Sequence, residues 1–117
     1  MENMTAYEDL ANAIITRAFE DYTPICLLIK KREMSVIKAQ EKYENLIEAA
    51  QAAEEAVKKA EAKLARQKGL LISAEAERNT LEGFFTSPWF RLLTNVDGAM
   101  LLEEAKKRAA AKLEVKK

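Results

Sequence analysis

The sequence contains no histidine and a single cysteine among its 117 residues. Histidine is the commonest general base and the commonest metal ligand in proteins, so its absence removes the usual machinery of acid–base and metal catalysis. One thiol can form neither an intramolecular disulfide nor a cysteine-based zinc site. We therefore expect a non-enzymatic protein with no catalytic residues, metal or cofactor, in which Cys26 serves as a small buried apolar side chain.

Neither sign of charge is in excess, because 19 Lys and Arg balance 19 Asp and Glu. A chain without net charge creates no long-range attraction to nucleic acid or to an anionic membrane, so we expect nucleic-acid contacts to be weak or indirect. The longest apolar run, residues 25–29, is far shorter than the ~20 residues of a membrane span. The first residues are acidic and lack the apolar segment of a signal peptide. These features predict a cytoplasmic protein without a membrane partner.

Helix breakers are scarce, with three glycines and two prolines, and the chain is predicted to be helical almost throughout. The run Thr5-Ala6-Tyr7-Glu8 matches a capping box, and apolar side chains recur behind it at three- and four-residue spacing as far as Tyr22. A first helix over residues 6–22 is therefore expected. Thr23-Pro24 predicts the start of the next helix, because proline suits the first helical position. A kinked continuation of the first helix is the alternative.

A heptad pattern of apolar residues runs from Tyr22 to Leu64 and predicts a coiled-coil seam. Its members are Tyr22, Ile25, Ile29, Val36, Ala39, Tyr43, Leu46, Ala50, Ala53, Val57, Ala60 and Leu64. Residues 49–65 contain eight alanines, so this seam lets helices approach closely but buries little area. Because an isolated Ala-rich helix is marginal in water, we expect a return helix or a second copy of the chain to cover it. Gln67-Lys68-Gly69 predicts the turn of such a hairpin, with Ser73 as the cap of the returning helix. One long rod, paired in a homodimer, is the alternative.

Aromatic residues are few, and half of them lie in the run Phe84-Phe85-Thr86-Ser87-Pro88-Trp89-Phe90. A fully buried aromatic ring contributes about 2–3 kcal/mol, so this run is predicted to form either the core of a small domain or the anchor of an interface. Ser87-Pro88 predicts the start of a short helix that continues to Leu93. A turn at residues 95–98 follows, with Asp97 as the cap of a last helix.

Together these elements predict an all-α fold, in which a long Ala-rich helical hairpin or coiled coil carries a small helical head. The head is formed by the N-terminal helix and the C-terminal aromatic segment. Residues 1–117 are expected to form one helical domain, with the head at about 5–35 and 78–110, the coiled-coil arm at about 36–77 and a frayed basic tail at about 110–117.

Two sets of side chains are candidates for binding a partner. The first joins the aromatic segment to its neighbouring cation, because Trp and Arg dominate interface hot spots; it comprises Phe85, Trp89, Phe90 and Arg91. In the alternative core interpretation, its three rings pack on the first helix at Tyr7, Ile14 and Phe19. The second set is a basic patch whose interleaved glutamates indicate a salt-bridged surface rather than a phosphate site; it comprises Lys58, Lys59, Lys63, Arg66 and Lys68.

Two stretches carry a family resemblance. The first is Tyr7-Glu8-Asp9-Leu10-Ala11-Asn12-Ala13-Ile14-Ile15, and the second is Phe84-Phe85-x-Ser87-x-Trp89-Phe90-x-x-Leu93-Thr94-x-x-Asp97-Gly98-x-x-Leu101-Leu102. Together they resemble a family of short helical proteins encoded by phages and prophages of Gram-positive bacteria. The match covers roughly a third of the chain, and the Ala-, Glu- and Lys-rich middle is longer than in typical members.

The resemblance implies a phage accessory protein that works in the cytoplasm of the bacterial host by binding another protein. Its implied role is to inhibit or modulate a host system, such as an anti-phage defence nuclease. Two alternatives remain open at this point. One is an accessory factor for DNA packaging or virion assembly, and the other is a nucleotide-signal sponge that uses Arg91 beside Trp89 and Phe90.

Overall fold

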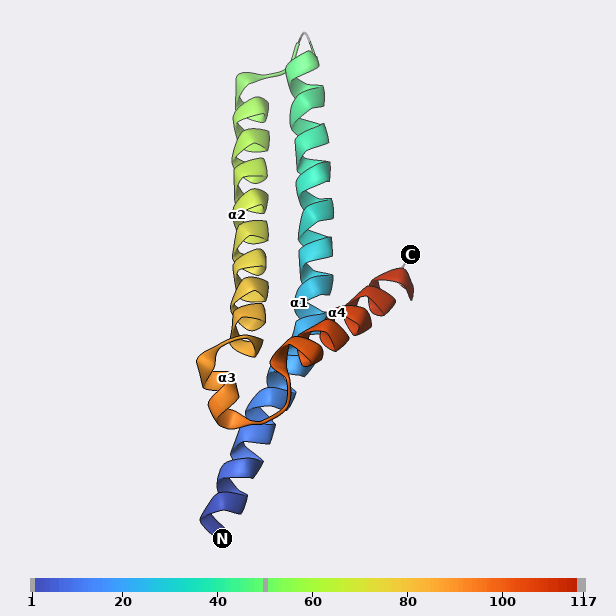
Figure 1. Cartoon of the computed structure of the whole chain (residues 1–117). Helices are drawn as coiled ribbons and strands as arrows, with labels where there is room; N and C mark the ends of the chain where they lie inside the picture. Colours follow the sequence, from blue (N-terminus) through green and yellow to red (C-terminus); the bar gives the residue numbers. More distant parts are fainter. Residues whose placement is uncertain (1, 50, 116–117) are drawn as a thin grey trace. The chain divides into compact units, whose positions relative to one another are not determined.

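The computed structural model of the chain is helical over nearly its whole length (Figure 1). It describes residues 2–49 and 51–115, and the side chains of residues 6–49 and 51–114. The helices are α1 (Glu2–Glu48), α2 (Glu54–Phe85), α3 (Pro88–Leu93) and α4 (Gly98–Val115). Within the described ranges there is no β-strand. The predicted all-α fold class is therefore confirmed.

Helix α1 continues through Pro24, so the predicted helix boundary at Thr23-Pro24 is wrong and the alternative of a continuing helix is correct. Proline has no amide hydrogen, so the bond that would run from position 24 to the carbonyl of Glu20 is missing. Tyr22 and Ile29, on either side of the proline, are both buried, and this burial offsets the cost of the lost bond. The helix also begins at Glu2, upstream of the predicted capping box at Thr5. The Thr5 side chain lies outside the described residues.

The chain reverses direction between the end of α1 at Glu48 and the start of α2 at Glu54 rather than at Gly69. Gly69 and Ser73 both lie inside α2, so the hairpin was predicted in the wrong place, and a single rod is excluded. Backbone hydrogen bonds join Ala52 N–H to the Ala49 carbonyl (3.3 Å) and Val57 N–H to the Ala53 carbonyl (3.1 Å). No proline or glycine marks this turn in the sequence. Its position follows instead from which apolar side chains of the two helices meet.

The chain divides into two compact units. The first, here called the head unit, comprises Met1–Leu27 and Glu77–Lys117; the second, the hairpin unit, comprises Leu28–Ala76. The boundaries predicted for head and arm lay near residues 35 and 78. The last helix runs to Val115 and so includes residues 110–115, for which fraying stays a prediction. Residues 116–117 lie outside the described part of the chain.

In the hairpin unit, parts of α1 and α2 lie side by side (Figure 1). The buried side chains of this unit are mostly small: Ile29, Ala39, Ala60, Leu64 and Ala74. All but Ala74 belong to the heptad pattern identified between Tyr22 and Leu64. Alanine allows two helices to approach closely but removes little apolar area from water. The stability of the hairpin unit therefore depends more on helix propensity than it would if large side chains filled its core.

Replacing Gly69 by alanine should stabilise the protein by about 0.5–1 kcal/mol, because Gly69 lies in the middle of α2 and glycine is a poor helix former. A Cβ added at Gly69 meets no atom within 4 Å, so no steric cost opposes this gain. Urea denaturation followed by circular dichroism measures the change. Ala65→Gly, at another exposed position of α2, is the reverse control and should destabilise by a similar amount. A loss of stability in Gly69→Ala would contradict the helical position of this residue.

The core of the head unit is built from all four helices. Its buried members are Ala18, Tyr22, Phe85, Phe90, Leu102, Ala105 and Ala109, and partly buried Ile15, Phe19, Cys26, Leu81, Phe84 and Leu101 pack against them. Alanines bring α1 and α4 close to the two large rings, Phe85 and Phe90, which are the largest fully buried side chains of the described residues. The head unit thus contains the large apolar side chains that the hairpin unit lacks.

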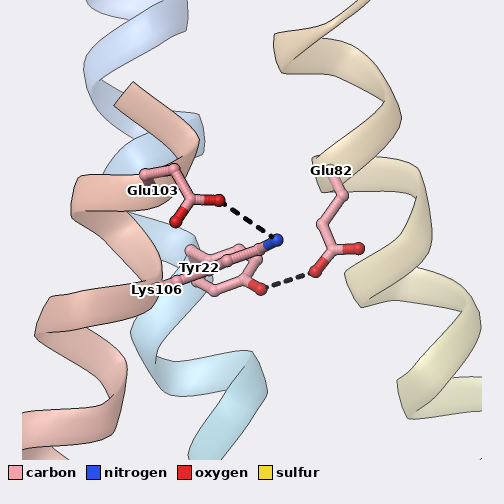
Figure 2. Close-up of polar contacts among 4 residues, drawn as sticks. All are labelled: Tyr22, Glu82, Glu103 and Lys106. Carbon is pink, nitrogen blue, oxygen red and sulfur yellow. Dashed lines mark hydrogen bonds and ion pairs between the residues drawn. The ribbon is translucent and has the colours of Figure 1, made fainter. Parts of the chain in front are cut away.

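One hydrogen bond within the head unit links α1 to α2 (Figure 2). The Tyr22 hydroxyl donates to Glu82 Oε2 at 2.6 Å, and an exposed ion pair between Lys106 Nζ and Glu103 Oε1 (3.7 Å) is drawn in the same view. Burial, followed by this hydrogen bond, raises the pKa of Tyr22 far above its usual value. Burial also raises the pKa of the half-buried Cys26 thiol, which therefore stays protonated at neutral pH, in keeping with its expected apolar role.

Tyr22→Phe should lower the free energy of unfolding by about 1.5–3 kcal/mol at neutral pH, because the hydrogen bond to a carboxylate is lost. The pKa of Tyr22 is higher in the folded protein than in the unfolded chain. The neutral Tyr22 side chain therefore contributes its full stabilisation below about pH 10. This contribution is lost as the pH rises through the folded-state pKa. The stability difference between wild type and Tyr22→Phe should therefore shrink in alkaline solution, as measured by urea denaturation across a pH series. Tyr43→Phe is the control at neutral pH: it removes a hydroxyl that forms no hydrogen bond within the described residues, so it should cost less than Tyr22→Phe.

Candidate functional site

The aromatic segment at residues 84–90 is divided between the core and the surface. Phe85 and Phe90 are 2% and 1% exposed, whereas Trp89, between them, is 53% exposed. Phe84 connects them, with its ring centroid 5.6 Å from Phe85, 5.4 Å from Trp89 and 5.4 Å from Phe90. The core interpretation is therefore correct for Phe85 and Phe90 and wrong for Trp89. Of the predicted binding set, only Trp89 and its neighbour Arg91 are accessible to a partner.

The short helix α3 explains this division. Ser87 is its N-cap: the Ser87 hydroxyl accepts a hydrogen bond from Phe90 N–H (3.1 Å) and donates to the Phe84 carbonyl (2.7 Å). Pro88 occupies the first turn, as predicted. Helical residues three apart share a face. Phe90 accordingly lies in the core and Leu93 is half-buried, while Trp89 and Leu92 are both exposed. Asp97 caps α4 in the predicted way, since its Oδ1 accepts from Ala99 N–H at 3.0 Å.

The outward face of α3 joins the start of α1 to form an exposed surface. The Tyr7 hydroxyl donates to the Leu92 carbonyl at 3.1 Å, across 85 positions of sequence. Leu92 is 74% exposed and Tyr7 is 51% exposed. We call Tyr7, Trp89, Arg91 and Leu92 the α3 surface. Tyr7 was expected in the core, and Leu92 was not singled out from the sequence, although its position one turn after Trp89 was a usable signal.

Next to this surface lies an open hollow of about 550 Å³, here called the α1–α3 hollow. It is lined by Tyr7, Glu8, Asn12, Arg91, Leu92, Leu93, Thr94 and Asn95. The hollow holds one carboxylate, Glu8, from α1 and one guanidinium, Arg91, from α3. These two side chains form no ion pair with each other or with any other described residue.

The predicted basic patch does not form one site. Its five side chains are all exposed along α2. Lys59, Lys63 and Arg66 share a face by their four- and three-residue spacing, whereas Lys58 and Lys68 lie on other faces of the helix. Lys58 is paired with Glu54 at 3.5 Å. This arrangement spreads the positive charge, as expected for a salt-bridged surface.

A second hollow in the head unit, also of about 550 Å³, has a different lining that includes Phe19, Thr23, Arg108 and Lys112. The Arg108 guanidinium lies 5.2 Å from the centre of the Phe19 ring, a contact that stabilises the packing of α4 on α1. The glutamate at position 20 also lines this hollow and lowers its positive potential. The arrangement is best explained as packing at the edge of the core.

None of the side chains in the described ranges gather into a group of three or more metal-binding residues. Nor does any helix in those ranges have the length and apolar character needed to cross a membrane. No protein-family model, curated protein sequence or solved structure matches the chain. The candidate site therefore rests on the geometry of the α3 surface and the adjoining α1–α3 hollow.

Proposed function

We propose that this chain is a non-enzymatic binding protein that contacts another protein through its α3 surface. The observation that carries the proposal is the exposure of Trp89. It is the sole tryptophan of the chain, and it remains half exposed although Phe85 and Phe90 close to it are almost completely buried. A large ring left in water costs free energy that burial against a partner recovers.

The composition and rigidity of the α3 surface support this proposal. Tryptophan, tyrosine and arginine are the residues most enriched in interface hot spots, and Trp89, Tyr7 and Arg91 all lie here. The edge contact of Trp89 with the Phe84 ring and the Ser87 cap stabilise this arrangement of α3 in the free protein. A surface ordered before binding loses little conformational entropy when the partner arrives.

The partner class that we propose follows from the resemblance to phage-encoded proteins. The chain would act in the cytoplasm of the bacterial host and inhibit or modulate a host protein system, such as an anti-phage defence nuclease. The spread of the basic residues along α2 and the zero net charge favour a protein partner over DNA packaging. The single guanidinium near Trp89 likewise favours a protein over a nucleotide signal, whose phosphates usually meet several donors.

Capture of partners from host lysate, followed by mass spectrometry, tests this proposal. Trp89→Ala should weaken binding of the captured partner by about 2 kcal/mol or more, which is about a thirtyfold loss of affinity. Ile72→Ala is the matched control, because Ile72 is also apolar and 66% exposed but lies in the hairpin unit. It should bind like wild type, and both variants should keep the wild-type circular dichroism spectrum.

Equal capture by wild type and Trp89→Ala would contradict the role of the α3 surface. Recovery of DNA in place of protein, in a salt-sensitive manner, would support the packaging alternative. Recovery of a nucleotide whose binding depends on Arg91 would support the sponge alternative.

A further inference from the structure

We infer that the α1–α3 hollow binds an extended peptide segment of the protein partner, one that carries an acidic and a basic side chain beside an apolar residue. This inference rests on the proposed protein-binding function and specifies the part of the partner that the site recognises. The α1–α3 hollow has a volume of about 550 Å³, which lies within the usual range for ligand sites, about 300–1,000 Å³.

The charges of the hollow define the charges of its occupant. Glu8 and Arg91 line the same hollow from two different helices, and each lacks an ion-pair partner among the described residues. A ligand that presents a cation to Glu8 and a carboxylate to Arg91 satisfies both groups. A phosphate-rich ligand fits poorly, because nucleic-acid and nucleotide sites gather several cations, and here the one guanidinium is balanced by one carboxylate.

The neutral polar side chains of the hollow favour an extended main chain. Asn12 and Asn95 both line it, and each amide offers two donor hydrogens and an acceptor oxygen. Neither side chain forms a hydrogen bond within the described part of the protein. An extended peptide has free N–H and C=O groups that match this pattern, whereas an α-helix has already paired its own.

The apolar residue of the peptide should pack on Leu92, at the edge of the hollow. The exposed side chain of Leu92 and the ring of Tyr7 both line the hollow, and Trp89 lies one helical turn before Leu92 on the same face of α3. An apolar side chain in the peptide would cover Leu92, while its polar neighbours reach Glu8 and Arg91. The α3 surface and the hollow thus form one continuous contact area.

Selection of peptides from a displayed random library against the full-length protein tests this inference. The enriched peptides should carry one acidic and one basic residue, and fluorescence polarisation with a synthetic copy measures its Kd. Arg91→Glu should weaken that peptide at least tenfold. Changing the acidic residue of the peptide to lysine should restore binding to the Arg91→Glu variant. Lys107→Glu, the same charge change at an exposed position of α4, should leave the Kd unchanged.

Amide chemical shifts recorded by NMR provide a second measurement, and the peptide should perturb Asn12, Asn95 and the backbone of α3. The inference is overturned if no peptide is enriched, if enriched peptides bind Arg91→Glu as tightly as wild type, or if the shifts map to another surface. These outcomes are distinct from those of the proposed function. A partner that depends on Trp89 but not on Arg91 or Glu8 would retain the proposed function and reject the peptide site.

Discussion

Phe90→Ala should lower the free energy of unfolding by about 3–5 kcal/mol, which is a large part of the 5–15 kcal/mol that stabilises a typical domain. The Phe90 ring is 1% exposed and lies against Phe84 and Phe85, with centroid distances of 5.4 Å and 5.7 Å. Its removal leaves a cavity at the point where α3 meets the core of the head unit. Urea denaturation monitored by circular dichroism gives the change directly.

Trp89→Ala is the matched comparison, because it removes a larger ring from the adjacent position. Since Trp89 is half exposed and contacts one ring of the cluster, we expect its loss to cost about 1 kcal/mol or less. The emission of Trp89 in the native protein should accordingly be that of a tryptophan in contact with water. A Trp89→Ala variant as unstable as Phe90→Ala would show that Trp89 belongs to the core.

Gly98→Ala should destabilise the protein by about 3 kcal/mol or more, at the upper end of the cost of overpacking. Gly98 is buried where α4 begins. A Cβ at this position would overlap the backbone carbonyl of Phe85 and come within 3.0 Å of the Phe90 ring. A backbone carbonyl cannot turn aside as a flexible side chain can, so the start of α4 would have to move away from α2. The melting temperature and the urea midpoint measure the effect.

Gly83→Ala is the control for this prediction. Gly83 lies in the last turns of α2, and a Cβ added there meets nothing within 4 Å. The control should therefore stabilise the protein by about 0.5–1 kcal/mol through helix propensity alone. If Gly98→Ala were as stable as Gly83→Ala, the close approach of Gly98 to Phe85 would be wrong.

Those features of the fold that depend on neighbouring residues could be predicted from the sequence. The low content of glycine and proline predicted an all-α chain, and Ser87-Pro88 and Asp97 predicted the starts of α3 and α4. Each of these signals acts over one helical turn: a side-chain oxygen accepts a bond from a backbone amide two or three residues later. The heptad pattern was correct in part, because helical periodicity sets which residues share a face. Tyr22, Ile29, Ala39, Ala60 and Leu64 are buried, whereas Ala53 is exposed and the other described members are half-buried.

Other features were decided only by contacts between distant segments. The reversal of the chain between Glu48 and Glu54 lies in an alanine-rich stretch with good helix propensity, so no local signal could place it. Pro24 stays inside α1 because apolar side chains on both sides of it are buried in the tertiary structure. The sequence presents Trp89 and Phe90 as equivalent adjacent rings, yet the core of the head unit buries Phe90 and leaves Trp89 half exposed. Tyr7 meets Leu92 across 85 positions for the same reason: burial and exposure depend on which neighbour covers a face, and that is a property of the assembled head unit.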